Sequence, residues 1–182
     1  MRTLGFAWLL AIGVLASPPP TWADPAHDLS SLAFLVGRWE ATGGGQPGEA
    51  AGSATFETSL QGQVLIRRSF AEYPATSSAP ASRHDDLMII YAESDGTLGA
   101  DYYDSEGHRI HYTVDVPSPG HAVFLSDKTA RGPRYRLTYE LHPSGHLGGE
   151  FAIAPPDHPE TFSPYLTWDS VRADGTAPGK GP

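Results

Sequence analysis

The feature that most constrains this chain is a turn signal that recurs about every ten residues along it. Examples are residues 94–96 (Ser-Asp-Gly), 105–107 (Ser-Glu-Gly) and 143–145 (Pro-Ser-Gly), which combine residue types favoured in tight turns. Between the turns lie short stretches rich in β-branched and aromatic residues, in which polar and apolar side chains alternate. This pattern predicts a meander of short antiparallel strands.

We expect ten strands, and they cover residues 38–42, 53–61, 64–73, 85–93, 98–104, 108–116, 122–126, 134–142, 146–154 and 162–172. One short helix is expected before them, with Asp28 or Ser30 as its N-cap and Gly37 at its end. An acidic soluble chain must protect the edges of its sheet, and closure of the sheet does so. The fold class predicted is therefore all-β, an antiparallel up-and-down barrel, and a two-sheet sandwich is the alternative.

The beginning of the chain has the pattern of a secretory signal peptide. Arg2 supplies a positive charge, residues 4–16 are apolar and uncharged, and small residues precede Asp24. The apolar run is short for a membrane span, which needs about 20 residues. We therefore expect residues 1–23 to be a signal peptide, 24–173 the barrel domain and 174–182 a disordered tail. The protein is expected to be exported, either to a periplasm or to the medium.

Charge and cysteine content limit the partners of the chain. Its formal net charge is −9, and it has no cysteine. Negative charge repels nucleic-acid phosphates and anionic lipids, so neither nucleic acid nor membrane insertion is expected. The lack of thiols excludes a disulfide scaffold and zinc sites built from thiolates. The core must therefore be stabilised by packing alone, for which a domain of this length suffices.

Alternation sorts the side chains of each strand into two faces. The expected wall of a ligand cavity consists of Met88, Tyr102, Tyr112, Phe124, Tyr135 and Tyr139. The neighbours Arg67 and Arg68 must point to opposite sides of their strand, so one of them should point into the barrel. There it would need an internal ion pair or a ligand carboxylate. The candidate protein partners are Glu72, Asp101 and Asp104.

The expected strand 85–93 is apolar on both faces. Its outer face therefore needs a cover, either the short helix or a second copy of the chain, and the second possibility makes a homodimer a candidate assembly.

Several kinds of active site are not indicated. The glycine-rich stretch 43–48 has neither the lysine nor the following helix of a phosphate-binding loop. His84 stands next to two carboxylates at an expected loop edge, but no spacing among the eight histidines is specific for a metal. No Gly-x-Ser-x-Gly motif is present, and residues 104–108 have ordinary turn chemistry. We predict no catalytic residue, no metal and no cofactor.

The Gly-Arg-Trp sequence at 37–39, placed after a short helix and before a run of strands, resembles the calycin superfamily of lipocalins and fatty-acid-binding proteins. In lipocalins the Trp of this motif packs across the barrel floor, and an Arg near the last strand stacks on it. The resemblance implies these floor roles for Trp39 and Arg172. A cation over a desolvated indole contributes roughly 1 kcal/mol or more.

Residues 29–173 are also similar to uncharacterised bacterial lipocalin-like domains, a likeness carried by stretches such as FLVGRWEATG, DLMIIYAESDG and RYRLTYE. No biochemical function comes with that likeness. A more distant similarity is to nitrobindin, a heme-binding barrel, through Gly37, Trp39, Gly43 and Gly45. Its heme-ligating His lies near the C-terminus, whereas this chain has no His after His158.

Three functions follow as hypotheses. The first is an exported barrel that binds a small apolar or amphipathic ligand, with Arg67 or Arg68 as its polar anchor. The second is a heme-binding or enzymatic barrel related to nitrobindin. The third is a filled barrel that serves as a structural or interaction domain. The sequence favours the first.

Overall fold

A computed structural model describes residues 29–42, 51–77 and 79–173. The expected signal peptide (1–23), the glycine-rich stretch 43–48 and the expected tail (174–182) lie outside the described residues.

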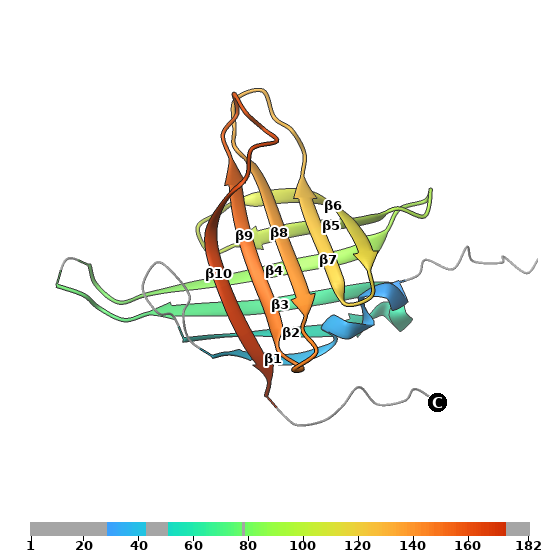
Figure 1. Ribbon diagram of the computed structural model, residues 1–182, viewed down its shortest axis with the longest axis horizontal. Helices are drawn as coiled ribbons and strands as arrows, with labels where there is room; N and C mark the ends of the chain where they lie inside the picture. Colours follow the sequence, from blue (N-terminus) through green and yellow to red (C-terminus); the bar gives the residue numbers. More distant parts are fainter. Residues whose placement is uncertain (1–28, 43–50, 78, 174–182) are drawn as a thin grey trace, which may run out of the picture.

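Ten antiparallel strands form a closed barrel in the order β1-β10-β9-β8-β7-β6-β5-β4-β3-β2. Their bounds are β1 Gly37–Ala41, β2 Ala51–Ser59, β3 Val64–Tyr73, β4 Ser82–Ala92, β5 Leu98–Asp104, β6 Arg109–Ser118, β7 His121–Ser126, β8 Arg134–Leu141, β9 Leu147–Ala154 and β10 Ser163–Arg172. The predicted ten-stranded antiparallel barrel is confirmed, and the two-sheet sandwich is excluded because β1 pairs with both β2 and β10. Strands β7–β10 cross steeply over β1–β5, which gives the barrel two layers (Figure 1).

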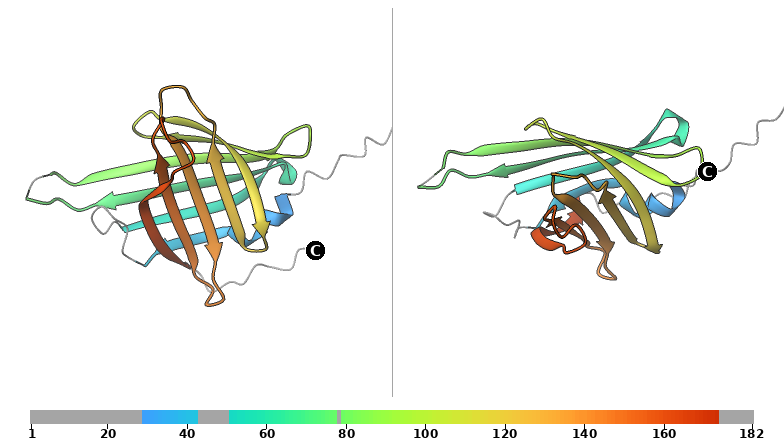
Figure 2. Two further views of the ribbon diagram at one scale, coloured as in Figure 1. Left: turned by 45° about the horizontal axis from the view of Figure 1, so that its top comes forward. Right: turned by 90° about the horizontal axis from the view of Figure 1, so that it is seen from above.

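The segment expected as a short helix is the 3₁₀ helix η1 (Leu29–Leu35). Its buried residues Leu29, Leu32 and Leu35 join the core cluster that contains Trp39. The helix lies at one end of the barrel, where β1 begins, and not over the outer face of β4 (Figure 2). On that outer face Leu87, among others, stays partly exposed. A second short 3₁₀ helix, η2 (Leu60–Gly62), joins β2 to β3.

Strand β4 begins at Ser82, three residues before the expected start at Asp85. The reason is pairing: the ladder between β3 and β4 continues without interruption to the pair Tyr73 and Ser82. The sequence of residues 74–84 is typical of a loop, but the partner strand extends the sheet over its end. His84 therefore lies on a strand and not at the edge of a loop.

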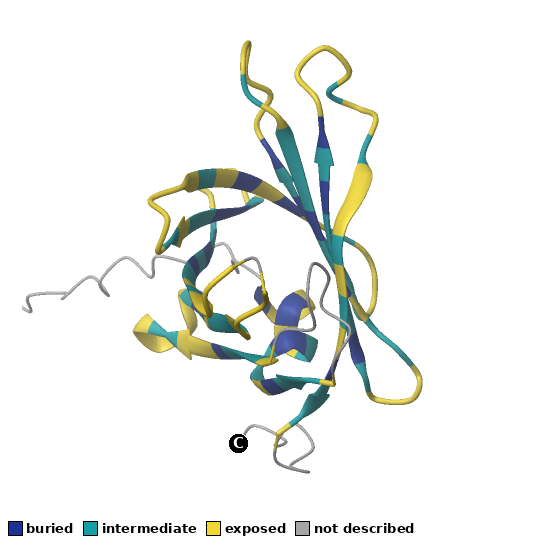
Figure 3. Ribbon diagram, turned by 90° about the vertical axis from the view of Figure 1, so that its left-hand side faces the viewer, coloured by how far each residue is buried: buried dark blue, intermediate teal, exposed yellow. Residues whose placement is uncertain are grey.

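Side chains that face the barrel interior are not equally buried along its length. At the end that η1 closes, inward residues such as Leu65, Ile90 and Leu147 are excluded from solvent. At the other end, inward residues remain partly exposed: Ser69, Ala71, Tyr73, His84, Tyr102, Ile110, Tyr135, Phe151, Ile153 and Leu166. We call this the open end. Seen from this side of the molecule, the strands form a ring with buried parts of η1 behind them (Figure 3).

Candidate functional site

The closed end is sealed by Trp39 of β1 and Arg172 of β10. The Arg172 guanidinium carbon lies 4.2 Å from the centre of the Trp39 ring. The same guanidinium donates to the carbonyls of Phe34 and Val36, at 3.0 and 2.6 Å, and the Trp39 indole donates to the Leu35 carbonyl at 2.7 Å. Carbonyls at the end of a helix lack helical partners, so these two side chains complete the end of η1. The two residues assigned to the floor are thus in contact.

Gly37, the first residue of β1, lies against the same guanidinium. Its φ is +125°, and a Cβ atom there would lie 2.5 Å from Nη1 of Arg172. Only glycine combines that backbone conformation with so close a neighbour. The Gly-Arg-Trp stretch is therefore part of the barrel's closure and not of a binding loop.

A polar cluster lies at mid-height inside the barrel, and Arg67 of β3 is its centre. Its Nη2 donates to Ser69 Oγ at 2.8 Å and to Asp86 Oδ2 at 3.1 Å, and Ser69 Oγ donates to the same carboxylate oxygen at 2.6 Å. The Arg67 and Asp86 side chains are only 10% and 5% exposed. Burial is the largest single influence and opposes the charge of Arg67, but the Asp86 carboxylate together with the hydroxyls of Tyr139, Tyr102 and Tyr112 outweighs it. The pKa of Arg67 therefore lies above its ordinary value.

Three atoms in this region have no hydrogen-bond partner within the described chain. They are Arg67 Nε, Asp86 Oδ1 and the Tyr139 hydroxyl. The Arg67 guanidinium carbon lies 5.9 Å from the centre of the Tyr139 ring, which places the first and third of them in one neighbourhood. A buried polar group without a partner destabilises a protein by about 1–3 kcal/mol. The cluster therefore offers two donors and an acceptor to a small polar group.

Aromatic side chains surround the cluster in edge-to-face contacts. Ring centres lie 6.5 Å apart for Tyr102 and Tyr112, 6.3 Å for Tyr112 and Phe124, and 6.0 Å for Phe124 and Tyr139. Trp168 continues this chain of rings, 6.1 Å from Tyr139. Burial raises the pKa of Tyr139 to about 12, so its hydroxyl is neutral and able to donate.

The residues assigned to the cavity wall all lie on the inner face: Met88, Tyr102, Tyr112, Phe124, Tyr135 and Tyr139. Met88, Tyr112, Phe124 and Tyr139 are fully buried core residues, whereas Tyr102 and Tyr135 lie nearer the open end and stay partly exposed. The sequence did not single out Trp168, although it alternates with outward polar residues on β10 as an inner residue should.

Two expectations about the arginines need correction. Arg68 points outward, is 62% exposed and lies 3.9 Å from Glu57, so it cannot serve as an anchor inside the barrel. The partner of Arg67 is Asp86. It is not one of the expected residues, which were Glu72, Asp101 and Asp104. Asp86 lies two residues before the inward Met88 on β4, so the two side chains share a face. This spacing in the sequence could have indicated that Asp86 points inward.

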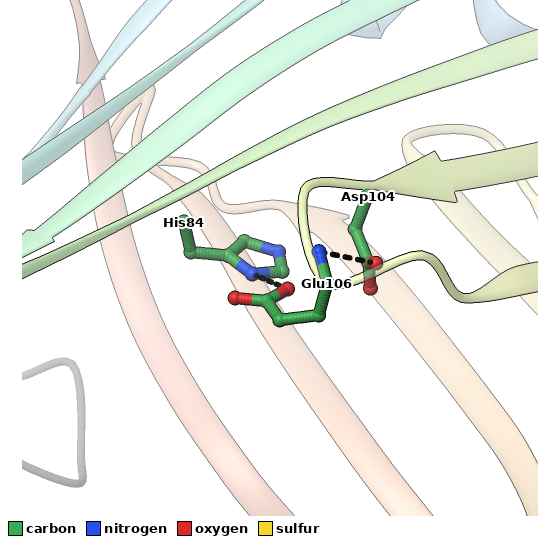
Figure 4. A group of neighbouring side chains, drawn as sticks. All are labelled: His84, Asp104 and Glu106. Atoms are coloured by element: carbon green, nitrogen blue, oxygen red, sulfur yellow. Dashed lines mark hydrogen bonds and ion pairs between the residues drawn. The ribbon is translucent and has the colours of Figure 1, made fainter.

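A second polar group lies above the cluster at the rim of the open end. It consists of His84 on β4, Asp104 at the end of β5 and Glu106 in the turn that follows (Figure 4). His84 Nδ1 lies 2.6 Å from Glu106 Oε2, and His84 Nε2 lies 3.1 Å from the Tyr102 hydroxyl and 3.7 Å from Asp86 Oδ2. The rim group is thus connected to the buried cluster.

The outer face of β7–β10 carries an open groove of about 790 Å³. Its residues are mostly polar or charged, and they include the ion pair of Arg136 and Glu150 at 3.0 Å. Neither of the barrel's polar groups reaches it.

Comparisons with known proteins found no match: no family model matches the chain, and no curated protein matches it either. Among the described residues, no helix has the length and apolar character needed to cross a membrane.

Proposed function

We propose that this protein is an exported lipocalin-like barrel of the calycin type, which binds a small amphipathic molecule through its open end. The single observation that supports this best is the set of partnerless polar atoms Arg67 Nε, Asp86 Oδ1 and Tyr139 OH, buried beneath a partly exposed aromatic wall. Ligand sites of this kind combine an apolar lining with a few placed polar groups.

The charge balance of the cluster specifies the polar end of the ligand. Arg67 is already neutralised by Asp86 at 3.1 Å, so a full negative charge on the ligand would meet a carboxylate as well as a guanidinium. A neutral group that both donates and accepts, such as a hydroxyl or an amide, fits the partnerless atoms better. The proposed anchor is therefore Arg67 together with Asp86, and not an arginine alone.

The apolar body of the ligand would lie against the inner residues of the open end. Tyr135 and Phe151 are stacked there with ring centres 5.7 Å apart, and Tyr165 adds a third ring 6.4 Å from Phe151. Tyr165 is 55% exposed, which is unusual for a large aromatic side chain in contact with other rings. Burial of these surfaces by a ligand would contribute roughly 25 cal/mol per Å².

The heme alternative has little support in the inner wall. On the described strands the inward-facing histidine is His84, and it lies at the rim of the open end beside the Asp104 and Glu106 carboxylates rather than deep in the apolar interior.

The test uses the mature protein, the uncharged fluorescent dye Nile red, and native mass spectrometry of protein recovered from the exporting host. Ile110→Trp places bulk on the inner face at the open end, and Thr113→Trp places the same side chain on the outer face of the same strand. We expect a co-purified small-molecule adduct and saturable dye binding that Ile110→Trp abolishes and Thr113→Trp preserves. Equal dye binding by both variants, with no adduct, would refute the proposal.

A further inference from the structure

We propose that His84, Asp104 and Glu106 form a binding site for one divalent transition-metal ion at the rim of the open end, with Zn²⁺ and Mn²⁺ as the best-suited ions. One ligand atom from each residue lies within 4.8 Å of the other two. Ligand atoms about 2.0–2.2 Å from a shared ion stand roughly 3–4 Å apart, so a small closure of the three side chains suffices. The inference does not depend on what the barrel interior binds.

The turn that carries two of the ligands is already ordered. Asp104 Oδ1 accepts hydrogen bonds from the backbone N–H groups of Glu106 at 3.1 Å and His108 at 2.8 Å. The turn is also fastened to β4, because Ser105 N donates to the Asp85 carbonyl at 2.9 Å and Asp85 N donates to Ser105 Oγ at 3.2 Å. Asp104 and Glu106 are therefore held next to His84 before any ion arrives.

His84 has the surroundings of a metal ligand. Its Nδ1 faces Glu106, and its Nε2 faces the Tyr102 hydroxyl and the Asp86 carboxylate. Metal-bound histidines usually donate their second ring nitrogen to a carboxylate or a similar acceptor, which fixes the ring and raises its basicity. The Tyr102 hydroxyl, 3.1 Å from Nε2, is the nearer partner, and Asp86, whose side chain is 5% exposed, places its Oδ2 3.7 Å from the same nitrogen.

The charges of the region provide an independent reason for a cation. Asp86 and Asp104 are directly opposite each other on β4 and β5, and their side chains are 5% and 4% exposed. Like charges at opposed positions of a sheet destabilise it. With Glu106 the region holds three carboxylates, and among the described side chains paired with them Arg67 carries the one permanent positive charge. A divalent ion would restore the balance.

His108 completes the arrangement as a positioning residue. Its Nδ1 lies 2.7 Å from Asp104 Oδ2, and its ring is 64% exposed. A donor set of one imidazole nitrogen and two carboxylate oxygens suits zinc or manganese, whereas calcium prefers oxygen ligands alone. The sequence did not suggest the set because its members come from two strands and a turn, so no single spacing contains them.

The test is isothermal titration of tag-free protein with ZnCl₂ or MnCl₂ alone, after dialysis against a chelator. We expect one ion per chain, with affinity reduced about tenfold or more in His84→Gln and in Glu106→Gln. The matched control is His158→Gln, which removes an exposed histidine 3.7 Å from Asp157 outside the site and should bind as the parent does.

The variants distinguish loss of metal binding from loss of the fold. Glu106 is 49% exposed in a turn, so Glu106→Gln should fold like the parent in chelator, and its result decides the matter if His84→Gln proves unstable. A Co²⁺ absorption spectrum that Glu106→Gln changes and His158→Gln does not would give the same answer by another route. Failure to bind either ion, or equal binding by the parent and Glu106→Gln, would mean that His84 and Glu106 form only an ion pair.

Discussion

Arg67 and Asp86 form an ion pair at 3.1 Å inside the barrel, from neighbouring strands in which Arg67 stands opposite Met88. Removal of one member of a buried pair leaves the other charge unpaired, which costs about 3–5 kcal/mol. We therefore expect Arg67→Met or Asp86→Leu to lower the free energy of unfolding by that amount in urea titrations. The double variant should recover most of the loss, because neither member of the pair is then left without its partner.

Arg68→Met is the matched control for this pair. Its side chain is 62% exposed and lies 3.9 Å from an equally exposed Glu57, so we expect a change below about 1 kcal/mol. Comparable losses for Arg67→Met and Arg68→Met would contradict the assignment of Arg67 to the interior.

Removal of the Tyr139 hydroxyl should affect ligand binding and stability in opposite ways. It is fully buried and has no partner in the described chain, so Tyr139→Phe should leave the free energy of unfolding of the ligand-free protein unchanged or raise it by about 1 kcal/mol. The same variant should bind the co-purified ligand more weakly. A loss of stability above about 1 kcal/mol in the ligand-free protein would show that the hydroxyl has a bonded partner, such as a buried water.

The strands could be predicted from the sequence, whereas the contacts between side chains of different strands could not. Turn signals and alternation predicted ten strands and sorted the residues of each into two faces, but they did not show which face points inward. Tyr112, Phe124 and Tyr139 were wall candidates as members of apolar faces, and their burial in the structure places them inside. The partner of Arg67 could not be named, because that depends on the register between β3 and β4, and alternation does not determine register. His84 was assigned to a loop because its local sequence is loop-like, whereas pairing with β3 extends β4 over it.

Two glycines with positive φ test the closure of the barrel at Arg172. A Cβ at Gly37 (φ +125°) would lie 2.5 Å from Arg172 Nη1, whereas a Cβ at Gly145 (φ +84°) would have no neighbour within 4 Å. Alanine at Gly145 should cost about 1 kcal/mol for its backbone alone. Gly37→Ala should cost clearly more in thermal unfolding, because it also displaces the guanidinium from Trp39. Equal costs at the two sites would show that the arginine contact contributes nothing.

The buried tyrosines predict how stability changes at high pH. Burial raises the pKa of Tyr139 to about 12, and burial also raises the pKa of Tyr112, whereas both titrate near pH 10 in the unfolded chain. Above pH 10 the unfolded state therefore binds fewer protons than the folded state, and stability falls as pH rises. Each group should contribute a loss of about 1.4 kcal/mol per pH unit between roughly pH 10 and 12.

Urea titrations across this range, together with the near-ultraviolet absorbance of tyrosinate, measure the effect. Tyr112→Phe should make the decline shallower and remove one late-ionising group from the folded protein. If all tyrosines of the folded protein ionise together near pH 10, the aromatic interior is accessible to hydroxide and the barrel is more open than its packing indicates.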